Sequence, residues 1–446
     1  MRIVLALGLV VSASFGSGAL AQEQVPAPAL LTLDAAVKIA LEKNPDLTRQ
    51  RIQALSSEQD RILARSTILP RVDFNAGYGR NRYQSEGGTQ LVQGVPVPVP
   101  AIRASNQWTG GLNVKQLVFD GGKWWNNLEA SQLGLEASRA SVDEQRLQIT
   151  YLVQQRFYEL VRAQRQLNVL GDAAARSRDQ ADFVQRLFEG GRSTQADVYQ
   201  ARANRDNDEI QRLGQERNVE LARADLALAV GVDPGEPLSV AEPPGLMDEP
   251  AQPPRPQEAV QRALSARPSL KAFELASQAN RKSVSAARGD YWPQVSLGAS
   301  YGRNTDQFGQ FDDLNPLHSS QIAGSVNLNW NLFAGLATDA NVRKAEYQVA
   351  LSENDLANGR RNVASDVEKA IAQLGTARAQ ARVAAQTLTT AGEGLRLART
   401  RQQVGVGTQL EVRDAELKLT QAQLSQVGAL VDGREAEAAL RRAQGS

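Results

Sequence analysis

The chain has 446 residues, of which 42% are hydrophobic and 22% are charged, a composition typical of a folded protein rather than a disordered one. Fifty Lys and Arg residues against 49 Asp and Glu leave a net charge of +1, so there is no basic excess for a nucleic-acid partner. The absence of cysteine excludes disulfides, thiolate metal sites and a Cys nucleophile, and a single histidine, His318, leaves few routes to zinc binding or His-based catalysis. We therefore predict no enzyme, no metal site and no cofactor.

The N-terminus is typical of a secretory signal peptide. A positively charged start, Met1-Arg2, precedes a short apolar run, and small residues then lead to Ala19-Leu20-Ala21. The alternative is a buried N-terminal helix. We predict a signal peptide over residues 1–21, and a mature protein that begins near Gln22 and acts beyond the inner membrane. No later stretch approaches the ~20 apolar residues of a spanning helix, so a membrane-spanning part would have to consist of strands.

The sequence repeats itself. "RVDFNAGYGRN" is followed 223 residues later by "PQVSLGASYGRN", as Tyr78 and Tyr301 show. "GGLNVKQLVF" and "GSVNLNWNLF" match at an offset of 214, and so do "FEGGRSTQADV" and "QQVGVGTQLEV". The drop in offset is explained by extra residues around "QLVQGVPVPVPA" in the first copy, which we interpret as a long exposed loop. The pattern indicates a duplication, with a first repeat over 22–232, a Pro-rich linker over 233–256 and a second repeat over 257–446.

Each repeat contains two segments in which apolar and small or polar residues alternate, near 71–119 and 294–333. A period of two over about ten residues predicts strands with one apolar and one polar face, arranged as a β-hairpin in each repeat. A soluble β-sandwich would show the same pattern, but the secretory start favours a membrane. We predict that the apolar face lies against lipid; it comprises Val72, Phe74, Tyr78, Leu112, Val114, Val295, Leu297, Tyr301, Val326, Leu328 and Trp330. Tyr78, Tyr83, Trp108 and Tyr301 could also form an aromatic girdle at the interface, with ordinary strand composition as the alternative.

Long helices follow each hairpin. From Val363 to Ala398, apolar residues recur at alternating spacings of four and three, and the matching positions run from Ile149 to Val184 with only Arg156 and Ser177 polar. This pattern predicts a coiled-coil seam, and the helix that begins after Gly335 should run for roughly 65 residues. Each repeat is therefore expected to read helix, two strands, long helix, turn and helix. Because four strands cannot close a barrel in lipid, the chain should form an oligomer; three copies would supply twelve strands.

Taken together, these segments resemble the TolC-type outer membrane efflux proteins over essentially the whole mature chain. "LTLDAAVKIALEKNPDL" is similar to the family's opening helix, and "ALAVGVDPGEPL" to the close of its first half. The resemblance implies a homotrimeric channel-tunnel of mixed α and β structure. In it, a twelve-stranded outer-membrane barrel continues into a periplasmic tunnel of long helices, which docks through a periplasmic adaptor onto an inner-membrane RND or ABC pump. The channel would serve tripartite efflux or type I secretion; the alternative from sequence is a secreted coiled-coil scaffold or adhesin.

Two turns, near 188–196 and 402–410, are predicted to form the tips of the helical hairpins. In each, a glycine ends one helix (Gly191, Gly405), and a threonine followed three residues later by an acid begins the next (Thr194 with Asp197, Thr408 with Glu411), as in a capping box. We expect these tips to face the adaptor.

Asp414 lies one turn after Glu411, beyond the cap. The resemblance implies that Glu411 and Asp414 ring the periplasmic entrance, whereas helix capping is the alternative for Glu411. In the family, a Tyr and an Arg close this entrance, and the corresponding residues here are Gln402 and Gly407, so the closing contacts must differ. The sequence leaves open the exported substrate, the pump and the adaptor.

Overall fold

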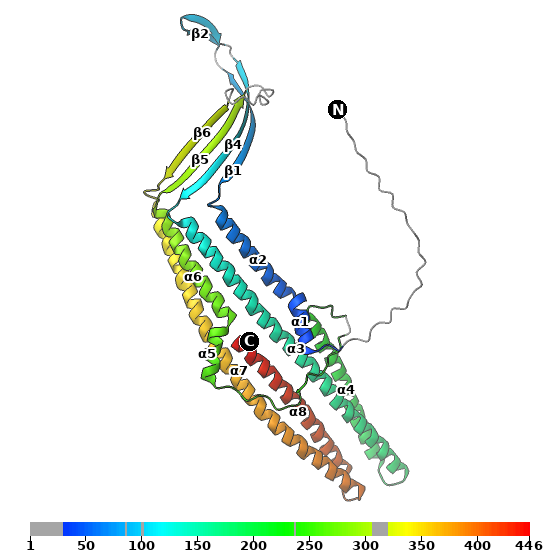
Figure 1. Cartoon of the computed structure of the whole chain (residues 1–446). Coiled ribbons are helices and arrows are strands. Elements are labelled where there is room, and N and C mark those ends of the chain that lie inside the picture. The colour runs from blue at the N-terminus through cyan, green and yellow to red at the C-terminus, as the bar shows by residue number, and fades with distance from the viewer. Residues whose placement is uncertain (1–29, 85–86, 100–101, 236–237, 306–319) are drawn as a thin grey trace, which may run out of the picture.

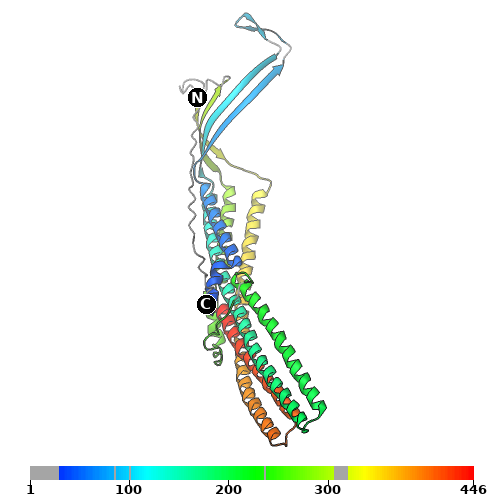
Figure 2. The ribbon, with the colours of Figure 1, turned by 90° about the vertical axis from the view of Figure 1, so that its right-hand side faces the viewer.

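The computed structural model describes residues 30–84, 87–99, 102–235, 238–305 and 320–446. The predicted signal peptide and His318 lie outside these residues. The protein is elongated, with a β-sheet at one end and a bundle of long helices that runs from the sheet to two hairpin tips at the other end (Figure 1, Figure 2).

The sheet combines both repeats. Its four long strands are β1 (Arg71–Gln84), β4 (Ile102–Phe119), β5 (Gln294–Thr305) and β6 (Ser320–Asn329), in the antiparallel order β1-β4-β5-β6. The hairpin of the first repeat therefore pairs with that of the second through β4 and β5. In the described part of the chain, the outer edges of β1 and β6 pair with no further strand.

Register separates the two faces of the sheet as the alternation predicts. One row crosses all four strands as Phe74, Leu112, Tyr301 and Ile322, because these residues are successive register partners. These apolar side chains form one face, on which Phe74 is 70% exposed and Val326 is 72% exposed. The opposite face is polar and contains a concavity of about 390 Å³, lined by residues that include Asn113, Lys115, Ser296, Ser300, Ser325 and Asn327. Among the described residues no element covers the apolar face, so within this part of the chain it is not the inner face of a sandwich.

The Pro-Val segment is not the plain loop that the sequence suggests. Strands β2 (Gly88–Val92) and β3 (Val95–Val99) form a second, two-stranded antiparallel sheet. Gln93 and Gly94, both with positive φ, make the tight turn between them. Val92 and Val95 flank this turn and pair with each other, so Pro96 and Pro98 take the alternate positions whose nitrogens lie on the free edge of β3. Proline is tolerated there because no ladder hydrogen bond is lost.

The helices repeat in length as well as in order. Helices α3 (Lys123–Glu189) and α7 (Ala337–Gln403) have 67 residues each, and α4 (Gln195–Val230) and α8 (Gln409–Gln444) have 36 each. Two helices, rather than the single one predicted, precede each hairpin: α1 (Leu33–Lys43) and α2 (Pro45–Ser66), then α5 (Pro256–Ala266) and α6 (Pro268–Arg288). The prolines at 45 and 268 divide them, because proline fits the first helical turn but removes an interior hydrogen bond.

The predicted coiled-coil seam lies in the core. Val363, Val367 and Leu374 on α7 are at most 5% exposed, and Ile149, Val153 and Leu160 on α3 are at most 2% exposed. The two polar residues of the seam each have an interaction partner on the same helix. Ser177 donates to the carbonyl of Ala174 at 3.1 Å, and Arg156 pairs with Glu159 at 2.7 Å.

Equivalent contacts close the two repeats. The side-chain amide of Asn44 donates to the carbonyl of Ala229 at 2.9 Å, and Arg267, at the matching position of the second repeat, donates to the carbonyl of Ala443 at 3.2 Å. Gly231 and Gly445 follow with φ of 83° and 81°. Arg267 also makes an ion pair with Glu144 on α3 at 2.8 Å, with both side chains nearly buried. The linker packs on α8, where a Cβ at Gly433 would lie 2.2 Å from the ring of Pro250.

Candidate functional site

The first hairpin tip is a complete helix cap. Gly191 has a φ of 69°, and the next helix, α4, starts at a capping box in which Thr194 Oγ1 accepts from Asp197 N at 3.2 Å and Asp197 Oδ2 accepts from Thr194 N at 2.9 Å. These hydrogen bonds, from the Thr194 backbone first and then from the hydroxyls of Thr194 and Ser193, lower the pKa of Asp197. Asp197 is therefore accounted for by the local structure of the tip.

The second tip is only half of such a box. Gly405 has a φ of 82°, and Thr408 Oγ1 accepts from Glu411 N at 3.2 Å, which starts α8. Within the described residues, the Glu411 carboxylate makes no return bond to the Thr408 backbone. It lies 3.6 Å from Arg401 Nε instead, and both side chains are exposed. Capping thus leaves the carboxylate of Glu411 available for another role.

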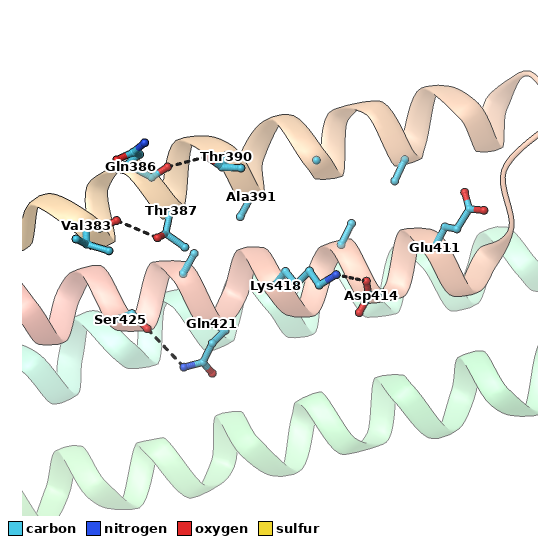
Figure 3. A pocket seen from close by; sticks show the side chains of 14 residues that line it. Val383, Gln386, Thr387, Thr390, Ala391, Glu411, Asp414, Lys418, Gln421 and Ser425 are labelled. Atoms are coloured by element: carbon cyan, nitrogen blue, oxygen red, sulfur yellow. Dashed lines mark hydrogen bonds and ion pairs between the residues drawn. The ribbon is translucent and has the colours of Figure 1, made fainter. Parts of the chain in front are cut away.

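A groove of about 820 Å³ runs between α7 and α8 beside this tip (Figure 3). Glu411, Asp414 and Lys418 lie along it on α8, and Asp414 Oδ2 is 2.6 Å from Lys418 Nζ. Small side chains of α7 and α8 make most of the remaining wall: Thr387, Thr390, Ala391, Gly394, Ala398, Ala415, Ala422 and Ser425. The two predicted entrance carboxylates are therefore neighbours in one groove, and each has a nearby cation.

The two residues that replace the family's closing pair lie close together, Gln402 in the last turn of α7 and Gly407 in the tight turn before α8. A Cβ added at Gly407 would lie 2.8 Å from Gln402 N, and Gly407 N donates to the carbonyl of Arg401 at 3.0 Å. No larger residue fits at 407 unless the backbone shifts. An arginine at this position is excluded by the turn itself, so the contacts that hold the tip must come from elsewhere.

The sequence interpretation missed two ion pairs near the tips, one between the two hairpins and one within the second hairpin. Arg413 on α8 makes a bidentate pair with Asp208 on α4, at 2.7 and 2.9 Å, and the two side chains are 19% and 7% exposed. Asp208 and the charge around it raise the pKa of Arg413. Closer to α7, Glu416 (5% exposed) accepts from Arg399 at 2.9 Å. Asp208 lies seven residues after the buried Ala201 and seven before the buried Gln215. A charged residue at this heptad spacing falls on the buried face of α4, and this spacing is the sequence signal that could have revealed the ion pair.

The predicted lipid-facing residues gather on one face of the sheet. Val72, Phe74, Tyr78, Leu112, Leu297, Val326, Leu328 and Trp330 are exposed, whereas Val114, Val295 and Tyr301 are half-buried. The predicted end of the last strand is wrong, because β6 ends at Asn329 and not near 333, so Trp330 lies just outside the strand. Its indole Nε1 donates to the carbonyl of Tyr291 at 3.2 Å, which ties it to the sheet–helix junction. The Tyr83 side chain lies outside the described residues. None of the described helices combines the length and the apolar character needed to cross a membrane.

Comparison with known proteins decides the family. The profile described as "Outer membrane efflux protein" matches residues 36–232 and 259–446, which together make up most of the chain. The chain belongs to the outer membrane efflux protein family. The two matched segments correspond to the two repeats and leave out the linker, and the membership places the protein in the outer membrane as a transport channel.

Similar proteins agree with this membership. The chain is 25% identical over 391 residues to the alkaline protease secretion protein AprF of Pseudomonas aeruginosa, covering 86% of this chain and 78% of that protein. It is 24% identical over 417 residues to the outer membrane efflux protein BepC of Brucella suis, covering 93% and 85%. Among solved structures, it matches the outer membrane protein VceC of Vibrio cholerae with a TM-score of 0.77 and 18% identity, covering 93% and 96%. It also matches the open MtrE outer membrane channel of Neisseria gonorrhoeae with a TM-score of 0.76 and 20% identity, covering 93% and 89%. The fold class and the outer-membrane channel function predicted from the sequence are confirmed.

Proposed function

We propose that three copies of this chain form a channel that carries substrates from an inner-membrane pump, of the RND or ABC type, through a periplasmic adaptor and across the outer membrane. The observation that carries the proposal is the four-stranded sheet. Within the described residues its outer edges at β1 and β6 pair with no strand, one face is apolar and exposed, and the other is polar. Three copies joined through these edges would close a barrel of twelve strands with its polar face inward, which satisfies every backbone group in lipid.

The two hairpin tips suit the adaptor end of this path. They lie farthest from the sheet (Figure 1), and their turns present Gly191, Thr194, Asp197, Gly405 and Thr408. The groove at the second tip supports a role for Glu411 and Asp414 at the periplasmic entrance, since three copies would bring six carboxylates around one axis. Arg401 and Lys418 lie beside these carboxylates and offset part of their charge. We therefore expect moderate rather than strong cation selectivity at the entrance.

The lipid-facing assignment is tested by a matched pair of substitutions on β6. Val326 belongs to the exposed apolar face, and Asn327, the next residue, to the polar face. Val326→Arg should place a cation against lipid at a cost of roughly 2–4 kcal/mol per chain, whereas Asn327→Arg should face water. The yield of heat-modifiable trimer in outer-membrane extracts measures the difference. Equal yields for the two variants would contradict both the barrel and its orientation.

The entrance is tested in planar bilayers. Glu411→Gln with Asp414→Asn should lower cation selectivity and weaken block by multivalent cations added from the periplasmic side, because the focused negative charge is lost. Asp197→Asn is the matched control. It removes a carboxylate at the other tip, while Thr194 still caps α4 through the backbone N of residue 197, and it should leave selectivity unchanged. If selectivity and block are unchanged in the double variant, Glu411 and Asp414 are ordinary surface charges and the entrance role is wrong.

A further inference from the structure

The repeated Tyr-Gly-Arg-Asn segments lie where each hairpin leaves its apolar band. In the first repeat they are Tyr78 to Asn81 on β1, and in the second Tyr301 to Asn304 on β5. Because side chains alternate along a strand, the arginine points to the same face as the tyrosine two residues before it. Neither the barrel nor the entrance explains why an arginine should recur at this position.

The register shows that the face does not change along β1. Fourteen consecutive pairs join β1 to β4, from Arg71 with Lys115 to Gln84 with Ile102, with no shift between them. Phe74, Tyr78, Arg80 and Arg82 therefore belong to the same face, in that order. At about 3.4 Å per residue, Arg80 lies roughly 7 Å beyond Tyr78, and Arg82 roughly 14 Å beyond it.

The aromatic pair at this level is oriented toward the arginines. The rings of Tyr78 and Trp108 are stacked at a tilt, with centroids 4.4 Å apart, and the Tyr78 hydroxyl donates to Asn106 Oδ1 at 3.1 Å. Asn106 is the register partner of Arg80. The phenol thus turns its polar end toward the next row of the sheet, which is the arrangement that amphipathic aromatic side chains adopt where hydrocarbon meets headgroups. In a membrane, this arrangement would set this level of the sheet at the interface and the arginines at the depth of the headgroups.

The β1 strand carries positive charge at this level. Arg80 and Arg82 are exposed, and no described carboxylate forms an ion pair with either of them. The sequence from Phe74 to Phe119 contains four basic residues, Arg80, Arg82, Arg103 and Lys115, and a single acidic one, Glu86. Arg303, the equivalent of Arg80 in the second repeat, is only 9% exposed. Among the described arginine side chains at this level, the exposed ones are therefore Arg80 and Arg82 on β1.

We propose that Arg80 and Arg82 bind the phosphate groups of lipid headgroups in the outer leaflet of the membrane. Each guanidinium presents a planar fork that matches a phosphate with two parallel hydrogen bonds, and the apolar stems of both side chains can lie along the strand while the charges reach the headgroups. Three copies of β1 would set six such groups around the barrel. This inference rests on the proposed function, because it requires the apolar face to lie in a membrane.

The test uses the purified trimer in detergent and a bis-phosphorylated lipid A as probe, with retention measured by native mass spectrometry. We expect Arg80→Gln with Arg82→Gln to weaken retention at least tenfold. The matched control Lys115→Gln removes a cation from the polar face of the same hairpin and should change retention less than twofold. Phosphatidylcholine, whose phosphate is masked by a cation, should be retained weakly by every variant. Equal loss in the two variants, or wild-type retention of phosphatidylcholine equal to that of lipid A, would overturn the proposal.

Two further arms keep the outcome unambiguous. Arg80→Lys with Arg82→Lys preserves the charge but not the planar fork, so lipid retention should fall about threefold. Retention equal to that of the wild type would overturn recognition by the guanidinium fork. This arm decides the question even if the Gln variant fails to assemble. Inorganic phosphate at 10 mM should leave most lipid bound, and complete displacement would indicate a site for free anions instead. If the wild-type chain forms a conducting trimer and lipid is retained regardless of these arginines, only this inference is overturned. If the wild-type chain forms no trimer, the proposed function itself is overturned.

Discussion

The buried ion pair between Arg413 and Asp208 should control how firmly the two hairpins hold together near their tips. Asp208→Asn keeps the shape of the side chain but leaves the guanidinium of Arg413, which is 19% exposed, without its counter-ion. Removing one partner of a buried pair typically costs about 3–5 kcal/mol, because the remaining charge is neither solvated nor paired. The cost falls on the contact between α4 and α8, because Asp208 belongs to the first hairpin and Arg413 to the second.

Hydrogen exchange of backbone amides measures this effect where it arises. A local loss of about 3 kcal/mol should accelerate exchange in the tip-proximal turns of α4 and α8 by roughly 100-fold, at tenfold per 1.4 kcal/mol, while exchange in the sheet should stay unchanged. Single-channel recordings of the same variant should show more frequent long openings, since the second hairpin carries the entrance groove.

An exposed ion pair on the same helix is the matched control. Asp414 and Lys418 are separated by only 2.6 Å, but their side chains are 58% and 70% exposed. Lys418→Gln should therefore cost no more than about 0.5 kcal/mol and accelerate exchange less than threefold. A variant with Leu at 208 and Met at 413 should recover most of the protection, because it buries no charge. If Asp208→Asn accelerated exchange no more than Lys418→Gln does, the reasoning from burial would be refuted.

Two remaining predictions concern the closure of the second repeat. Burial by itself would raise the pKa of Glu144, but the hydrogen bond and the positive charge of Arg267 outweigh it and lower that pKa. The stabilisation by the Glu144–Arg267 pair should be complete above the ordinary glutamate pKa of roughly 4.3, and it should fade as the pH drops through the lowered pKa of Glu144 in the folded protein. Amide exchange at the α5–α6 junction should show this loss of stability in the wild type but not in Glu144→Gln. Gly445→Ala should cost about 1–2 kcal/mol, because φ is 81° and the added Cβ would lie 3.1 Å from the carbonyl of Ala266. Thermal denaturation is the measurement, and Gly171→Ala, in the interior of α3 with nothing within 4 Å of its Cβ, should instead be neutral or slightly stabilising.

Periodicity alone predicted the elements and their repetition. Alternation over ten or more residues identified β1, β4, β5 and most of β6, and the heptad spacing identified the seams of α3 and α7, because side-chain burial follows the geometry of an isolated strand or helix. The 214-residue offset placed both tips, and the structure repeats it in the equal lengths of α3 with α7 and of α4 with α8. These features depend on neighbours within a few turns of the chain, so the order of residues was sufficient.

Other features depend on which distant segments meet, and only the tertiary structure decided them. The pairing of β4 with β5 joins the two repeats into one sheet, and the register across it aligns Phe74, Leu112 and Tyr301 in one row. Asp208 and Arg413 are 205 residues apart, and Glu144 and Arg267 are 123 apart, so no local pattern could have matched them. The Pro-Val segment reads as a loop because proline is a poor strand former, yet its prolines suit β3, where their nitrogens face a free edge. Local chemistry thus determined the long helices and strands of this protein and the apolar face of each long strand, whereas the partner of each buried charge and the pairing of the two repeats in one sheet were set by packing between segments far apart in the chain.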